Sequence, residues 1–547
     1  MEIQTMKKLE EEALKKSGTD FTRLGFALFF MIGVLTYSFL SNGGIPNNMF
    51  LAIAALIGAY MAMNIGANDV ANNVGPAVGS KAMTMTMAIV IAAIFEASGA
   101  LIAGGEVVKT IKKGIIDISA FGGNADPFIW AMMAALLAAA LWLNFATMMR
   151  APVSTTHSIV GGVMGAGIAA AGFSIVSWTT MGKIAASWVI SPVLGGVIAA
   201  AFLFAIKKSI VFQDDKVSAA KKWVPVFVAL MSWAFVTYLT LKGLKKIWPD
   251  VVEVLNYLPL VSLEMSKKPT LITALVMGGI TALIVYFVIK AKLASNKTAL
   301  ENSKDSVNTL FTIPLIFAAA LLSFAHGAND VANAIGPLAA INDAVVNGGI
   351  SSKASIPLWV MGVGALGIAL GLALYGPKLI RTVGSEITEL DQIRAFSIAM
   401  AASITVIIAS QLGLPVSSTH IAIGGVFGVG FLREYLHLND TTTIEEDKEI
   451  IKDEKTNLHA YQAELKTLEN KSEKSSTEYE RVVELYKLIA DEEKLIKSTK
   501  KHIKQTKKVE YVKRDAVKKI IAAWVITVPA AATLAAVLFY MIRGIMI

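Results

Sequence analysis

The sequence predicts an all-α polytopic membrane protein of about 12 transmembrane helices, built from two inverted repeats with broken or re-entrant helices. Three observations indicate this fold: an apolar composition, many long apolar segments, and motifs that occur twice. Of the 547 residues, 55% are hydrophobic and 17% are charged, far from the average of soluble domains. A helix needs about 20 apolar residues to cross a bilayer core of about 30 Å. The segments that meet this requirement lie near 22–41, 46–64, 82–103, 126–148, 183–206, 223–243, 270–290, 308–326, 357–379, 393–411 and 519–543.

The composition also excludes several classes of function. The chain has no cysteine, so disulfides, thiolate metal sites and cysteine nucleophiles are excluded. The net charge of +9 comes mainly from lysines beside apolar segments, where they set orientation, and we expect no nucleic-acid partner. No nucleophile, base and orienting group recur at a recognisable spacing, so we expect neither an enzyme nor a cofactor. The apolar run at 22–41 lacks a signal-peptide cleavage site and is expected to be the first transmembrane helix.

Three motifs recur in the same order in both halves of the chain. GANDVANNVGP at 66–76 returns as GANDVANAIGP at 327–337. APVSTTHSIVGGVMG at 151–165 returns as LPVSSTHIAIGGVFG at 414–428, and IAASWVISPV at 184–193 returns as IAAWVITVPA at 521–530. The two copies of a motif lie about equally far apart along the chain for the first two motifs and further apart for the third, so the second half carries an insertion before its third motif.

The insertion is rich in charged residues, and its stretches LHAYQAELKTLE and YERVVELYKLIADEEKLI have the pattern of solvated amphipathic helices. We expect a helical hairpin or short coiled coil outside the bilayer. The predicted organisation is an N-terminal segment with one transmembrane helix (1–45), repeat 1 (46–206), a linker with two transmembrane helices (207–307), repeat 2 (308–437), the soluble insertion (438–518) and the last helix of repeat 2 (519–547).

Basic linkers set the predicted orientation. The linkers 207–222 and 291–305 are both basic and are separated by two spans, so they lie on one side of the membrane, the cytosolic one. Two halves with odd numbers of crossings then have opposite orientations, as in many secondary transporters. The N-terminus and the insertion are expected in the cytosol, and the C-terminus outside a plasma (inner) membrane. The loop 244–269 contains four lysines and disagrees with its predicted place outside.

The first motif predicts a cation site. An ionised Asp at the bilayer centre costs about 2.5–3.5 kcal/mol on insertion scales, so Asp69 and Asp330 should face a protein interior or an aqueous cavity. Carboxylate and amide oxygens suit a hard cation such as sodium. Nearby glycines and prolines are expected to break both helices and expose backbone carbonyls. The alternative is that each Asp only caps a broken helix. The predicted sodium-binding residues are Asn68, Asp69, Asn72, Asn329, Asp330 and Asn333.

The second motif predicts an anion site. In PVSTTH and PVSSTH the proline suits the first turn of a helix, and the hydroxyl residues suit its cap. Free N–H groups at a helix start attract an anion. The alternative is an ordinary capped helix whose GG-x-x-x-G tail serves close packing. The predicted substrate-binding residues are Ser154, Thr155, Thr156, Ser417, Ser418 and Thr419.

Three further residues are possible site residues. Glu96 is a lone carboxylate in an apolar segment, which points to function, although its counterpart in the other half is apolar. His157 and His420 follow the hydroxyl clusters and either touch the anion, shuttle a proton or serve as scaffolding. A second break in symmetry is His326, which stands where the first half has Ile65.

The duplicated motifs GANDVANN and GANDVANAIGP, with PVSTTHSIVGG and PVSSTHIAIGG, resemble the signatures of the inorganic phosphate transporter (PiT) family of sodium–phosphate symporters. The resemblance implies a dimeric, inverted-repeat transporter that moves phosphate with co-transported sodium by an elevator-like shift. It also implies that the Asp-Asn residues form the cation and substrate centre and that the hydroxyl residues bind phosphate. Eukaryotic relatives place a long cytosolic loop between the halves, whereas this chain has the insertion at 438–518.

Alternatives remain within and outside this class. A symporter driven by protons, or one for sulfate or arsenate, fits the same motifs. An anion channel, or a membrane scaffold whose soluble helices recruit partners, is the alternative of a different class.

Overall fold

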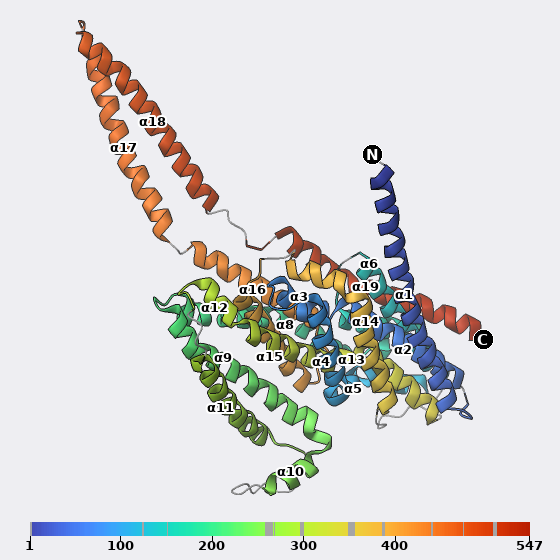
Figure 1. Ribbon diagram of the computed structural model, residues 1–547. Coiled ribbons are helices and arrows are strands. Elements are labelled where there is room, and N and C mark those ends of the chain that lie inside the picture. The colour runs from blue at the N-terminus through green and yellow to red at the C-terminus, as the bar shows by residue number, and fades with distance from the viewer. Residues whose placement is uncertain are drawn as a thin grey trace. The chain divides into compact units, whose positions relative to one another are not determined.

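The computed structural model is helical throughout its described part (Figure 1). The residues that it describes are 3–46, 48–122, 125–149, 151, 153–257, 266, 268–295, 300–347, 356–385, 389–438, 441–473, 475–506, 511–512 and 514–546. These residues form no β-strand, and their one isolated β-bridge joins Ile116 and Val176. Eleven described helices are long and apolar enough to cross a membrane. The predicted all-α polytopic fold is confirmed, with one candidate span for each of the eleven predicted segments.

The helices follow the order of the sequence motifs. The N-terminal and first-repeat helices are α1 (Ile3–Ser41), α2 (Asn48–Asn68), α3 (Ala71–Gly79), α4 (Met85–Ala103), α5 (Gly105–Lys113), α6 (Ala125–Met148), α7 (Thr155–Ala171) and α8 (Trp178–Ile206). The helices between the repeats are α9 (Lys216–Tyr238), α10 (Trp248–Asn256) and α11 (Leu271–Ser295). The remaining helices are α12 (Lys304–Leu310), α13 (Thr312–Val346), α14 (Leu358–Ser385), α15 (Gln392–Gln411), α16 (Ser418–Leu438), α17 (Thr441–Glu469), α18 (Ser476–Thr506) and α19 (Arg514–Met546).

Short 3₁₀-helical and π-helical turns are found between these helices in the described chain. They are η1 (Ile118–Phe121), η2 (Phe173–Ile175), η3 (Lys207–Val211), η4 (Leu239–Gly243) and η5 (Leu244–Lys246). The described chain divides into two compact units, which are Met1–Val429 with Arg514–Ile547, and Gly430–Lys513. The first unit contains every candidate membrane span.

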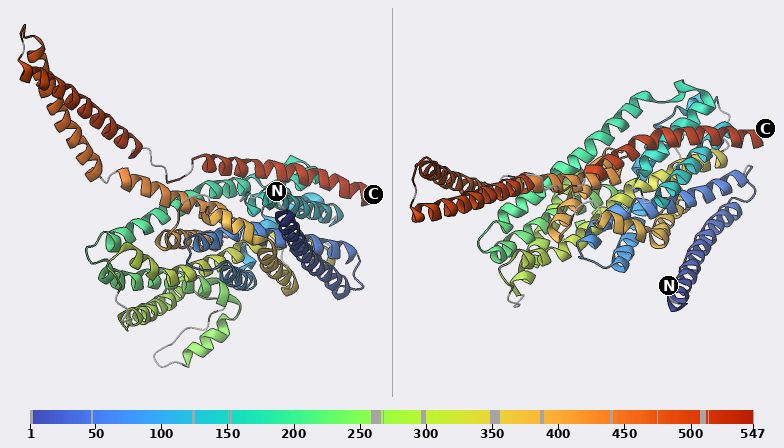
Figure 2. Two further views of the ribbon diagram at one scale, coloured as in Figure 1. Left: turned by 45° about the horizontal axis from the view of Figure 1, so that its top comes forward. Right: turned by 90° about the horizontal axis from the view of Figure 1, so that it is seen from above.

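The two repeats are intertwined within the first unit. Helix α14 of the second repeat packs along α2 of the first, and α13 packs along α4 (Figure 2). The helices that begin with the hydroxyl motifs also pack across the repeats, since α7 of the first repeat packs on α19 of the second. The second helix start makes the equivalent contact, with Gly424 of α16 lying against the backbone of Pro192 in α8. Equivalent motifs from the two halves are therefore brought to one place.

The repeats run in opposite directions through the membrane. Between the start of α2 and the start of α13 lie the candidate spans α2–α3, α4, α6, α8, α9 and α11, together with α7, which is too short to be one of them. Helices α6 and α7 pack on each other, and as an antiparallel pair they add either two crossings or none. The total is odd in both cases, so α13 runs opposite to α2. This is the inverted-repeat arrangement of secondary transporters.

The helix break that was predicted for both Asp motifs occurs in only one of them. Helix α2 ends at Asn68 and α3 begins at Ala71, with the N–H of Asn72 bonded to the Asp69 carbonyl at 3.0 Å. Helix α13 continues through the second motif without interruption, so the predicted break there is wrong. A Cβ on Gly327 would lie 2.2 Å from the carbonyl oxygen of Glu96. This glycine therefore serves the close approach of two helices.

Gly66 makes the same kind of approach, and it gives a stability prediction. A Cβ at this position would lie 1.9 Å from the carbonyl oxygen of Ile368, so Gly66→Ala must push α2 and α14 apart. We expect a loss of about 1–3 kcal/mol in the free energy of unfolding, the usual cost of overpacking. The measurement is thermal unfolding of the detergent-solubilised protein. Gly33→Ala is the matched control, because a Cβ there meets nothing within 4 Å, and equal melting temperatures for the two variants would contradict the prediction.

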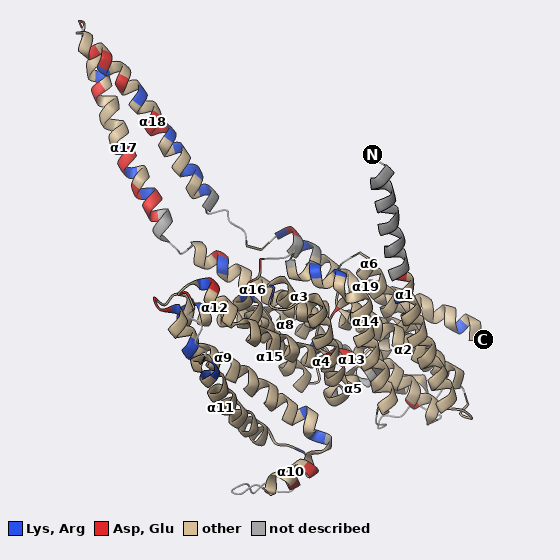
Figure 3. Ribbon diagram, in the orientation of Figure 1, with Lys and Arg blue, Asp and Glu red and all other residues tan. Residues whose placement is uncertain are grey.

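The second unit contains the charged helical hairpin that the sequence predicts, formed by α17 and α18. Lys, Arg, Asp and Glu follow both helices along their length, whereas the membrane helices are largely free of them (Figure 3). Helix α18 starts with a capping box, in which the Ser475 hydroxyl accepts from the Glu478 N–H and the Glu478 carboxylate accepts from the Ser475 N–H. The Lys471 ammonium and this N–H lower the pKa of Glu478 to about 2. The Glu478 carboxylate at the start of α18 therefore stays ionised over the physiological pH range.

Candidate functional site

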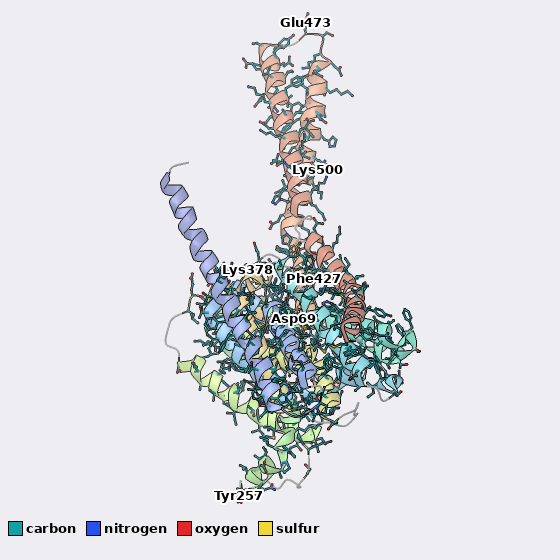
Figure 4. The ribbon with its side chains drawn as sticks, turned by 90° about the vertical axis from the view of Figure 1, so that its right-hand side faces the viewer. Asp69, Tyr257, Lys378, Phe427, Glu473 and Lys500 are labelled. Carbon is teal, nitrogen blue, oxygen red and sulfur yellow. The ribbon has the colours of Figure 1, made fainter. Side chains whose placement is uncertain are left out.

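The two Asp motifs meet in one buried cluster. The Thr155 hydroxyl donates to Asp69 Oδ2 at 2.6 Å, and the hydroxyl oxygen of Thr155 also lies 3.2 Å from Asp330 Oδ2. Asp69, His326 and Asp330 each offer one atom, and these atoms all lie within 4.8 Å of one another. All four side chains are fully buried. Figure 4 shows Asp69 in the middle of the helical body, away from both of its ends.

The hydroxyl motifs open two helices beside this cluster. Ser154 is the N-cap of α7, and its hydroxyl accepts from the His157 N–H at 3.1 Å. Ser417 occupies the same position before α16, and its hydroxyl accepts from the His420 N–H at 3.2 Å. Both helices therefore start at the predicted residues, and their first turns face the interior rather than lipid.

Each repeat supplies an amide to the hydroxyls of the other. Asn72 Nδ2 donates to Thr419 Oγ1 at 2.8 Å. Asn333 Nδ2 donates to Thr155 Oγ1 at 3.0 Å and to Thr156 Oγ1 at 3.1 Å. Ser418 adds a hydroxyl that donates to Asp330 Oδ2 at 3.2 Å. Four sequence motifs therefore form a single cluster at the contact between the repeats.

Several oxygens of this cluster have no hydrogen-bond donor in the described part of the chain. They belong to Asp69, Asn72, Asn73, Asn329, Asp330 and Asn333, each through its Oδ1 atom. A buried oxygen without a partner costs about 1–3 kcal/mol, so native sites seldom leave so many together. Hard oxygens of this kind are the ligands that sodium or another hard cation prefers. Five of the six residues predicted to bind sodium therefore have an oxygen to offer.

Asn68 is the exception among them. Its Oδ1 accepts from the Val153 N–H at 3.3 Å, and its Nδ2 donates to Thr147 Oγ1 at 2.9 Å and to the Ala151 carbonyl at 3.2 Å. The backbone groups of the turn before α7 need hydrogen-bond partners, and the Asn68 side chain is the partner of two of them. This side chain holds the turn in place and its Oδ1 already accepts one hydrogen bond, so its role as a cation ligand stays a prediction.

Glu96 and His326, the two residues that break the symmetry of the repeats, are partners of each other. Glu96 Oε2 lies 2.7 Å from His326 Nδ1, and His326 Nε2 lies 3.1 Å from Asp330 Oδ2. Asn73 Nδ2 donates to Glu96 Oε1 at 2.7 Å. His326 and Asn73 are absent from the site that the sequence predicts. His326 lies four residues before Asp330, which puts both on one helix face. This spacing was the sequence signal that could have indicated His326 as a site residue.

His157 and His420 lie in an aromatic stack and not among the carboxylates. Their ring centroids are 4.4 Å apart, with Trp188 3.8 Å from the first ring and Trp524 3.6 Å from the second. No hydrogen bond joins either ring to the amides or carboxylates of the cluster within the described residues. The two tryptophans belong to the third repeated motif, so this motif packs the helix starts against α8 and α19.

The comparisons with known proteins follow the same motifs. The model of the phosphate transporter family matches residues 65–535. The chain belongs to the phosphate transporter family. A protein named "Putative phosphate permease" from Helicobacter pylori strain J99 is 49% identical over 554 residues, which cover 98% of both chains. A protein of the same kind of name from Thermococcus kodakarensis is 38% identical over 392 residues, 71% of this chain and 90% of the relative.

A solved structure gives the same assignment for this family member. The structure named "The sodium-dependent phosphate transporter" aligns with a TM-score of 0.70 and 30% identity, and the alignment covers 91% of this chain and 99% of that one. The resemblance that the duplicated motifs indicated is therefore confirmed at the level of the family.

Proposed function

We propose that this family member imports inorganic phosphate together with sodium ions across the inner membrane. The observation that carries the proposal is the buried cluster in which unpartnered carboxylate and amide oxygens lie beside the hydroxyls of two helix starts. The oxygens suit a small hard cation, and the helix starts suit an oxyanion. The solved relative is named as a sodium-dependent transporter, which supports sodium as the coupling ion.

The carboxylates decide the order of binding. Two like unit charges about 4 Å apart repel by roughly 4 kcal/mol at an effective dielectric constant of about 20. A phosphate anion beside Asp69 and Asp330 meets this repulsion twice, since Thr155 lies within hydrogen-bonding distance of both carboxylates. Sodium ions on the open oxygens remove the repulsion. Sodium therefore binds first, and phosphate then binds at the first turns of α7 and α16.

Movement of the loaded site completes the cycle. We expect residues 46–206, 308–437 and 519–547 to form the transport core, and part of this core to shift across the membrane in an elevator-like motion. The protein is expected to act as a homodimer, with its N-terminus and the hairpin 438–518 in the cytosol and its C-terminus outside.

The test is uptake of labelled phosphate into liposomes that contain the purified protein. With equal pH on both sides, an inward sodium gradient should drive phosphate above its external concentration, and replacing sodium by potassium should abolish this accumulation. Uptake that only equilibrates would indicate a channel. Sulfate and arsenate, added in excess, show which tetrahedral oxyanion the site accepts.

A second candidate, proton-coupled phosphate transport, is favoured by one observation. Glu96, His326 and Asp330 form a continuous buried chain of titratable groups that reaches the site, and histidine is suited to exchange protons near neutral pH. In the same liposomes, accumulation driven by an inward proton gradient without sodium would support this candidate and exclude sodium coupling.

A further inference from the structure

A cavity of about 650 Å³ lies between α1, α2, α6 and α14. Half of its lining residues are apolar and half are polar or charged, and each of the four helices supplies both kinds. The charged groups of the wall are Asp20, Arg23 and Lys378, and its polar groups include Asn64 and Thr147. Asn64 is only 5% exposed, so polar groups of the wall lie deep beside membrane-spanning helices. These groups need hydrogen-bond partners, which water offers and lipid tails do not.

The inner end of the cavity touches the transport site. Thr147 lines the cavity, and its hydroxyl accepts from Asn68 Nδ2 at 2.9 Å. Asn68 in turn binds the turn before α7 through Ala151 and Val153. Asn68 is fully buried and precedes Asp69 directly. One side-chain contact therefore separates the cavity from the predicted cation site.

The residues at the equivalent position in the second repeat are buried. Asn329 Nδ2 donates to Ser410 Oγ at 2.9 Å, which repeats the contact of Asn68 with Thr147. Ser410 is 3% exposed and bonds to Tyr238, which is 1% exposed. Thr110 also donates to the Gly413 carbonyl at 2.8 Å and secures the turn before α16. The cavity therefore reaches the contact next to the site on the first-repeat side, whereas the described residues that make the equivalent contact in the second repeat are buried.

Net positive charge lies at the outer end of the cavity. Arg23 stands at the start of the first span, and the exposed Lys378 is a second cation on the wall. Asp20, 3.5 Å from Arg23, is the carboxylate among the lining residues, so two cations and one anion leave a net charge of one positive unit. In Figure 4, Lys378 lies at the end of the body from which the N-terminal part of α1 projects, and Tyr257 lies at the other end. The family model begins at residue 65, so α1 and its arginine lie outside the region that defines the family.

We infer that this cavity is the aqueous route by which phosphate reaches or leaves the site on the side of the N-terminus, and that Arg23 and Lys378 attract the anion to it. A cleft with an excess of one sign of charge raises the local concentration of its counter-ion and the rate of association. The inference rests on the proposed function, because it assigns a path to the same phosphate site. It adds a role for α1, which contributes no residue to the transport site itself.

Thiol labelling tests the path. The sequence has no cysteine, so Met31→Cys, on the cavity wall, and Ile32→Cys, outside it and 57% exposed, each create the only thiol. We expect a charged, membrane-impermeant thiosulfonate added on the N-terminal side to modify Met31→Cys at least about ten times faster than Ile32→Cys, since thiolates form in water and not in lipid. Saturating phosphate with sodium should slow the reaction. Equal rates, or an unreactive Met31→Cys, would show that lipid fills the cavity and would overturn the inference.

Charge removal tests the attraction. The double variant Arg23→Gln/Lys378→Gln should raise the KM for phosphate on the N-terminal side roughly three- to ten-fold at low ionic strength, with kcat unchanged and the difference lost in high choline chloride. Lys221→Gln removes a lysine of the same predicted membrane face that lies outside the cavity wall, and it should leave the KM unchanged. An unchanged KM in the double variant overturns the role of the two cations. Wild-type uptake in the same vesicles shows separately whether the proposed function holds.

Discussion

Asp330→Asn is expected to reduce sodium-driven phosphate uptake at least about 100-fold while the protein still folds and inserts. The carboxylate Oδ2 lies 3.2 Å from the Thr155 hydroxyl, accepts from the Ser418 hydroxyl at 3.2 Å and lies 3.1 Å from His326 Nε2. Its Oδ1 has no donor among the described residues. Asparagine keeps the volume but removes the charge that would hold a cation. A 100-fold loss corresponds to about 2.8 kcal/mol, which is within the range for a hydrogen-bonded charged group.

Initial rates of uptake in liposomes, measured over a range of sodium concentrations, test this expectation. Asp69→Asn should behave alike, because the Asp69 carboxylate makes the corresponding contact with Thr155 and also leaves Oδ1 free of donors among the described residues. Asp343→Asn is the matched control. It removes a buried carboxylate from the same helix, α13, and this carboxylate accepts a hydrogen bond from Asn347. Wild-type sodium dependence in Asp330→Asn would remove Asp330 from the cation site.

The main parts of the site could be predicted from sequence because they occur twice. A single Asp in an apolar segment is ambiguous, but Asp69 and Asp330 lie in nearly identical motifs and are followed in the same order by hydroxyl motifs. Inverted repeats place equivalent residues around one axis, so the four motifs were expected to meet. The contact of Thr155 with both carboxylates shows that they do.

What sequence reasoning missed depends on packing between the repeats. The partner of Glu96 is 230 residues away, and only the packing of α4 on α13 brings the two together. The continuity of α13 was missed for a related reason. Its glycine looks like a helix breaker in the sequence, but it is needed because the backbone of Glu96 passes within van der Waals distance. The role of Asn68 depends on the turn before α7, which lies more than 80 residues further along the chain.

The second large effect is expected at the contact between Glu96 and His326. Glu96→Gln and His326→Gln should each lower uptake by more than about 30-fold, because the first leaves Asp330 as the carboxylate beside His326 and the second leaves the fully buried Glu96 carboxylate without the imidazole. Removing one member of a buried pair typically lowers the free energy of unfolding by roughly 3–5 kcal/mol, mostly because the remaining charge is left buried without a partner. His326→Gln also removes the group between Glu96 and Asp330, so the KM for sodium should change with it.

The double variant Glu96→Gln/His326→Gln separates this pairing from two independent roles. With both members of the pair replaced, neither is left without its partner, so the double variant should transport no worse than His326→Gln alone, a strongly non-additive result. If the two losses instead multiply, the residues act separately and the pairing does not explain the effect of either. The pH profile of uptake adds a readout that a purely structural role would not move. A profile that flattens in the double variant, with sodium dependence retained, would show that the pair sets the protonation state of a site whose coupling ion is still sodium.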